Sequence, residues 1–172
     1  GALELKTHPT RGAQMDKDFC LSEEFFNNHP LYPHVGETLK ELHNLGYKQF
    51  ILSATFDVET KKRLLNTLLA EVSDFLTIEC VRHGEFMHDT AKEEMLIACF
   101  EKYDLRAEET MLVDDRIYNQ YAAINAGAVP VRVRCEFTTD LPADINWIPE
   151  FKSVVEVKNW LVEGAKFFVQ PK

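Results

Sequence analysis

Apolar residues recur along the chain in two alternating patterns. Segments with an apolar residue every three or four positions, typical of amphipathic helices, alternate with short apolar runs typical of buried strands. The first pattern predicts helices at residues 35–45, 57–70, 90–103, 117–126 and 154–161. The second predicts strands at residues 47–52, 75–80, 111–113 and 129–133. Such alternation predicts a Rossmann-like, three-layer α/β/α sandwich with a mainly parallel sheet.

Glycines and chain length support this organisation. Gly46 and Gly127 follow two of the predicted helices, at the position where a C-terminal capping glycine belongs. A chain of 172 residues is long enough to bury the core of one domain. We therefore expect residues 1–172 to form a single domain with its core at residues 31–164, whereas residues 1–30 form an ambiguous strand or flap segment.

Charge and composition limit the classes of partner. The net charge of −9 disfavours nucleic acid and anionic membrane surfaces as partners, although a phosphorylated nucleic-acid end stays open as a substrate. A small phosphate ester fits this charge, because a bound divalent cation reverses the field locally. No apolar run is long enough for a membrane span, and no signal peptide is recognisable, so we expect a cytoplasmic protein. The four cysteines are scattered without metal-ligand spacing, which favours reduced thiols.

The most informative segment runs from residue 111 to residue 128. A predicted strand ends on two adjacent carboxylates, Asp114 and Asp115, and Asn119 follows one turn into the next helix. Parallel sheets bind ligands beyond the carboxyl ends of their strands, and Mg²⁺ accepts one or two carboxylates while keeping water and substrate phosphate. The alternative is structural, since either aspartate would also serve as a cap for the helix that starts near Ile117.

This segment resembles the fourth motif of phosphatases of the haloacid dehalogenase (HAD) superfamily, in the variant with two aspartates followed by Arg116 and Asn119. Residues 31–54 are similar to the helix and strand that lead into the second motif. The motifs are nearest to those of magnesium-dependent phosphatases with a minimal cap and of the phosphatase domain of phage polynucleotide kinase/phosphatases. The resemblance implies a HAD-like fold with a minimal cap or none, and Mg²⁺ as cofactor held by Asp114 and Asp115.

The same resemblance implies two phosphate contacts. Ser53 occupies the second-motif position at the end of its strand, where it would donate a hydrogen bond to a phosphoryl oxygen, with Thr55 as a fallback. The alternative for Ser53 is a turn or capping residue. Lys92 occupies the third-motif position at a helix start, where the helix dipole disfavours a lysine without a function. The alternative for Lys92 is a solvated surface residue.

The first motif of the superfamily carries the nucleophile, as the first aspartate of a DxDx(T/V) pattern at the end of a central strand. Asp16 and Asp18 have this spacing, but the preceding Gly-Ala-Gln-Met at residues 12–15 does not resemble a buried strand.

A second register takes residues 2–5 as the central strand and is our preferred interpretation of the fold. It places Glu4 at the nucleophile, Lys6 at the acid/base position and His8 at the threonine position. Glutamate is one methylene too long, and Lys6 places a cation where a metal belongs, so this register predicts a weak or inactive enzyme.

Together these features predict a HAD-like phosphohydrolase that hydrolyses phosphomonoesters with Mg²⁺ through an aspartyl-phosphate. Asp16 and Asp18, with Lys92, are the candidate catalytic residues. The alternative is an inactive pseudo-phosphatase that acts as a binding or regulatory module. A minimal cap leaves an open site, so the expected substrate is a phosphorylated small molecule or a phosphorylated macromolecule end.

Overall fold

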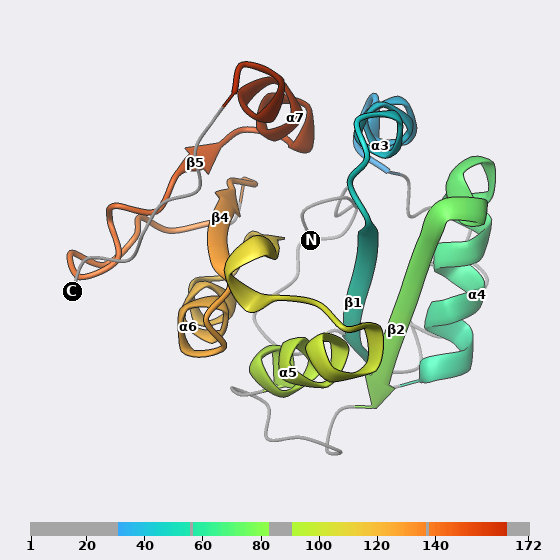
Figure 1. Cartoon of the computed structure of the whole chain (residues 1–172), viewed down its shortest axis with the longest axis horizontal. Coiled ribbons are helices and arrows are strands. Elements are labelled where there is room, and N and C mark those ends of the chain that lie inside the picture. Colours follow the sequence, from blue (N-terminus) through green and yellow to red (C-terminus); the bar gives the residue numbers. More distant parts are fainter. Residues whose placement is uncertain (1–30, 56, 83–90, 137, 165–172) are drawn as a thin grey trace. The chain divides into compact units, whose positions relative to one another are not determined.

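The computed structural model describes residues 31–55, 57–82, 91–136 and 138–164. These residues fall into two compact units, an N-terminal unit (described residues 31–82) and a C-terminal unit (described residues 91–164). Each unit is an arrangement of helices around parallel strands (Figure 1).

The N-terminal unit packs two helices and a 3₁₀ turn against a parallel strand pair. Its elements are α3 (Val35–Asn44), β1 (Gln49–Thr55), α4 (Val58–Leu68), η1 (Ala70–Phe75) and β2 (Leu76–Arg82). Helix α4 begins where the Asp57 carboxylate accepts a hydrogen bond of 2.9 Å from the Thr60 amide. It packs on both strands, and α3 packs on η1, where the His43 and Phe75 rings stack at 4.2 Å between centroids.

The C-terminal unit is built on a three-stranded parallel sheet with the order β3-β4-β5. Its elements are α5 (Ala91–Tyr103), η2 (Ala107–Glu109), β3 (Met111–Asp114), α6 (Ile117–Asn125), β4 (Val129–Val133), β5 (Glu150–Phe151) and α7 (Val154–Val162). Every residue of the central strand β4 is buried. Helix α6 packs on β3, β4 and α5, and Gly127 follows its C-terminal end with a φ of 80°, in the left-handed region that favours glycine.

The α/β prediction is confirmed, because all strand pairs of the described residues are parallel, and helices separate β1, β2, β3 and β4 along the chain. The boundaries of the first two strands were wrong, since the predicted ranges 47–52 and 75–80 are Gln49–Thr55 and Leu76–Arg82 in the structure. Ser53 does not end its strand: β1 continues to Thr55, because Ser53 pairs with Cys80 and Thr55 with Arg82 of β2. The short strand β5 was not predicted, since two residues carry no recognisable apolar spacing. The single-domain prediction stays a prediction, and residues 1–30 lie outside the described residues.

Among the described helices, none combines the length and apolar character needed to cross a membrane.

Candidate functional site

The two aspartates lie where β3 gives way to α6. Asp114 is the last residue of β3 and pairs in register with Arg132 of the neighbouring strand β4. Asp115 follows it and is only 5% exposed. The strand thus delivers two adjacent carboxylates at its carboxyl end, which is where parallel sheets bind ligands.

The Asp114 carboxylate uses one oxygen to order the turn into α6. Its Oδ1 accepts hydrogen bonds of 2.9 Å from the backbone N–H of Arg116 and from Nδ2 of the buried Asn119. Its Oδ2 has no hydrogen bond to any residue in the described part of the chain. The amide that Asp114 bonds belongs to Arg116, the residue before the helix, and not to the first turn of α6 itself. Asp114 therefore stabilises the strand-to-helix turn with one oxygen and leaves the other without a hydrogen bond to a described residue.

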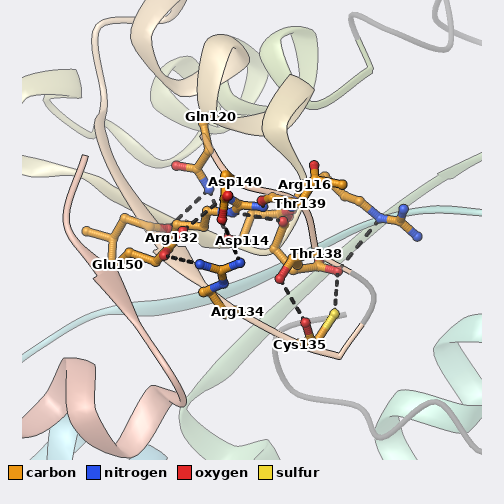
Figure 2. Close-up of polar contacts among 12 residues, drawn as sticks. Asp114, Arg116, Gln120, Arg132, Arg134, Cys135, Thr138, Thr139, Asp140 and Glu150 are labelled. Carbon is orange, nitrogen blue, oxygen red and sulfur yellow. Dashed lines mark hydrogen bonds and ion pairs between the residues drawn. The ribbon is translucent and has the colours of Figure 1, made fainter. Parts of the chain in front are cut away.

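The Asp115 carboxylate lies between a cation and a thiol. Its Oδ2 is 3.7 Å from Nε of Arg116 and accepts a hydrogen bond of 3.7 Å from Sγ of Cys135, which follows β4. The Arg116 side chain is 46% exposed, and its guanidinium points away from the neighbouring Arg132 and Glu150 side chains (Figure 2). The edge that carries two carboxylates therefore also carries an exposed positive charge.

Two buried polar side chains hold the main-chain carbonyls of the acidic pair. Gln120, on α6, donates from Nε2 to the Asp114 carbonyl at 2.9 Å and to the Val131 carbonyl at 3.3 Å. Arg132 donates from Nε to the Asp115 carbonyl at 3.4 Å. Sequence reasoning missed both residues. The one signal was the presence of an arginine within the otherwise apolar run of residues 129–133.

Arg132 is also the centre of an ionic network (Figure 2). Its Nη1 lies 3.0 Å from Glu150 Oε2, and its Nη2 donates to the Thr139 carbonyl. Glu150 Oε1 lies 3.1 Å from Arg134, whose other terminal nitrogen lies 3.0 Å from Asp140. The hydrogen bond to Asp140 and the charge of Glu150 raise the pKa of Arg134 above its ordinary value.

Ser53 and Thr55, the predicted phosphate donors, lie in the N-terminal unit. Both are half-buried residues of β1. Their contact with phosphate stays a prediction.

Lys92 is the second residue of α5 and half-buried. The next residue, Glu93, accepts a hydrogen bond of 3.2 Å from Asn125, the last residue of α6. The nine-residue helix α6 spans about 12 Å, and the acidic pair lies at its other end. The structure therefore brings Asp114, Asp115 and Asn119 together but places the first turn of α5 beside the far end of α6. The phosphate role of Lys92 stays a prediction.

The candidate nucleophile residues Asp16 and Asp18, and the alternative Glu4, Lys6 and His8, lie outside the described residues. Within the parts of the chain that are described, no three His, Cys, Asp or Glu side chains gather into a metal-binding group. The acidic pair is thus a site of two carboxylates, a number that suits Mg²⁺ completed by water and substrate oxygens.

Solved structures share the fold at low identity. A D,D-heptose 1,7-bisphosphate phosphatase from B. bronchiseptica, complexed with magnesium and phosphate, is 16% identical with a TM-score of 0.64, over 84% of this chain and 92% of that one. A predicted phosphoglycolate phosphatase from Haemophilus somnus is 19% identical with a TM-score of 0.62, over 84% and 63%. A haloacid dehalogenase-like hydrolase from Streptococcus pneumoniae is 20% identical with a TM-score of 0.60, over 79% and 62%. The chain thus spans less than two thirds of the last two proteins.

These likenesses confirm the predicted HAD-like fold, whereas the nearer likeness to phage polynucleotide kinase/phosphatases stays a prediction. No curated protein matches the chain. The model of the family of haloacid dehalogenase-like hydrolases matches residues 6–127, more than two thirds of the sequence, and so includes the acidic pair. The chain therefore belongs to the haloacid dehalogenase-like hydrolases.

Proposed function

We propose that this protein hydrolyses phosphomonoesters with Mg²⁺ held by Asp114 and Asp115. The observation that carries the proposal is the acidic pair itself. Two consecutive carboxylates stand at the carboxyl end of β3, and Asp114 Oδ2 makes no hydrogen bond to any described residue. The family match supports hydrolysis, and the names of two structural neighbours describe phosphatases.

The donor set fits a hard divalent cation. Both candidate ligands are carboxylates, whereas the nearby Cys135 thiol bonds Asp115 and is not a donor that Mg²⁺ favours. The bound cation would neutralise charge on the phosphoryl oxygens as the ester bond breaks. Asp114 would bind with a side chain already oriented by Arg116 and Asn119, so little rotamer freedom remains to be lost on binding.

The remaining roles are taken from the sequence motifs. Ser53 and Lys92 would donate hydrogen bonds to phosphoryl oxygens, the second with a full positive charge. In the register that uses Asp16 and Asp18, Asp16 would attack phosphorus to form an aspartyl-phosphate, while Asp18 gives a proton to the leaving alcohol. Water then attacks the same phosphorus and gives its proton to Asp18, which releases phosphate and restores Asp16.

The substrate class follows from charge and size. A phosphorylated small molecule, or the phosphorylated end of a macromolecule, fits an open site with a minimal cap. The net charge of −9 disfavours a nucleic-acid end, because the phosphate backbone would be repelled away from the metal site. We place this activity in the cytoplasm.

The test is turnover of p-nitrophenyl phosphate with Mg²⁺ and with EDTA. We expect turnover only with Mg²⁺, and its loss in Asp115→Asn. Asp140→Asn is the matched control, because it removes a carboxylate that is 92% exposed and pairs with Arg134 rather than with the acidic pair. Equal turnover with EDTA would contradict the proposal. If the parent chain binds Mg²⁺ but does not hydrolyse the ester, the result favours the alternative of an inactive pseudo-phosphatase.

A further inference from the structure

Two polar side chains beneath the acidic pair are almost completely inaccessible to solvent. Gln120 is 0% exposed and Arg132 is 1% exposed. Burial of an amide, and still more of a guanidinium, costs free energy unless its donors find acceptors. Both side chains donate to the acidic pair, Gln120 to the Asp114 carbonyl and Arg132 to the Asp115 carbonyl. The two most deeply buried polar side chains of the C-terminal unit therefore hold two consecutive carbonyls.

We propose that Gln120 and Arg132 are positioning residues, which we name the carbonyl clamp. By fixing the main chain of Asp114 and Asp115 they set where the two carboxylates point. The clamp itself rests on the geometry of the protein alone, and its effect on Mg²⁺ rests on the proposed function.

The shape of the guanidinium explains why an arginine is needed. All three nitrogens of Arg132 are used, Nε on the Asp115 carbonyl, Nη1 on Glu150 and Nη2 on the Thr139 carbonyl. These acceptors lie in different segments of the chain, and the planar guanidinium group donates hydrogen bonds to all three of them at once. A lysine would keep the positive charge opposite Glu150. Its single ammonium group lacks the separate Nε donor, so the hydrogen bond to the Asp115 carbonyl would be lost.

An ion pair with Glu150 alone would not require a buried arginine. Arg134 already pairs with Glu150 from a position that is 42% exposed, and it has no contact with Asp115 among the described residues. Both arginines and Glu150 lie beyond the segment matched by the family model, which ends at residue 127. The clamp is therefore built partly by a C-terminal segment that the family match does not describe.

The experiment compares Arg132→Lys and Gln120→Met with Arg134→Met as the matched control. Methionine has about the length of glutamine but no donor, and Arg134→Met removes an equal charge and a Glu150 contact without touching the clamp. The first readout is hydrogen exchange of the Arg116 amide in the metal-free protein, because this amide bonds Asp114 Oδ1 and so reports the carboxylate position. The second is the Mg²⁺ dissociation constant by calorimetry.

We expect both clamp variants to exchange the Arg116 amide at least about tenfold faster than the parent, and to bind Mg²⁺ about 10- to 100-fold more weakly, the usual effect of losing a residue that orients metal ligands. Arg134→Met should change neither value. Unchanged exchange in both clamp variants would overturn the proposal. So would faster exchange shared equally by the amides of β4, because that pattern means a general loss of stability. A parent chain without Mg²⁺ binding would refute the proposed function, while the exchange data would still decide the clamp.

Discussion

Replacing Arg132 by methionine should destabilise the C-terminal unit strongly. The substitution keeps an apolar stem of similar length but removes the donors to the Asp115 carbonyl, the Thr139 carbonyl and Glu150. Arg134 still pairs with Glu150, which is 26% exposed, so this carboxylate keeps a partner and access to water.

The magnitude follows from the two carbonyls. A buried acceptor left without its donor costs about 1–3 kcal/mol. The hydrogen bond to the Asp115 carbonyl is long, at 3.4 Å, so its loss should cost an amount near the lower limit of that range. The lost ion pair with Glu150 destabilises the unit further. Breaking a fully buried pair costs roughly 3–5 kcal/mol, but the cost here is smaller because Glu150 keeps its ion pair with Arg134. We therefore expect the free energy of unfolding to fall by about 3 kcal/mol.

Urea unfolding followed by tryptophan fluorescence measures this loss. The two tryptophans, Trp147 and Trp160, both belong to the C-terminal unit, so the signal reports the unit that holds Arg132. Arg134→Met is the control and should barely shift the urea midpoint, since exposed ion pairs contribute little. An Arg132→Met midpoint equal to that of the control would refute the reasoning that the buried guanidinium satisfies these acceptors.

Three further predictions concern other parts of the chain. Lys92→Ala should weaken tungstate binding by roughly 10- to 150-fold, the equivalent of a charge-assisted contact, and unchanged affinity in calorimetry would return Lys92 to a surface role. The helix-start hydrogen bond from a backbone amide lowers the pKa of Asp57, so the stability it contributes is complete above the ordinary carboxyl pKa of 3.8 and is lost as pH falls below it. The difference in Tm between the parent and Asp57→Ala should therefore shrink in acid, and a constant difference would contradict this account. Asp16→Asn should abolish Mg²⁺-dependent turnover; an unaffected variant, or a weak parent rescued by Glu4→Asp with Lys6→Asp, would favour the other register.

The elements predicted from apolar spacing include those that carry the acidic pair. Residues 129–133 were predicted as a strand and form β4, because a mostly apolar run that follows Gly127 is typical of a parallel strand covered on both faces, and every residue of β4 is buried. The end of β1 was missed for a different reason. Whether a strand stops at Ser53 or Thr55 depends on how far β2 accompanies it, and this pairing is not visible in the residues of β1 alone.

The carbonyl clamp was not predictable from the sequence. Arg132 lies in an apolar strand, but its partner Glu150 is 18 residues away, on a strand of two residues without apolar periodicity. The buried position of Gln120 also depends on tertiary packing, since a glutamine in a helix is usually exposed. By contrast, Asp114 and Asn119 are only five residues apart, so the sequence already placed both near the strand-to-helix turn, although it did not predict their hydrogen bond.

The most direct test of the account is calorimetric titration of Mg²⁺ into the parent chain, Asp115→Asn and Asp140→Asn. The account predicts one Mg²⁺ bound by the parent and by Asp140→Asn, and no binding by Asp115→Asn, with all three proteins giving the same circular dichroism spectrum. Unchanged Mg²⁺ affinity in Asp115→Asn, or no binding by the parent, would contradict the claim that the acidic pair at the end of β3 is a metal site.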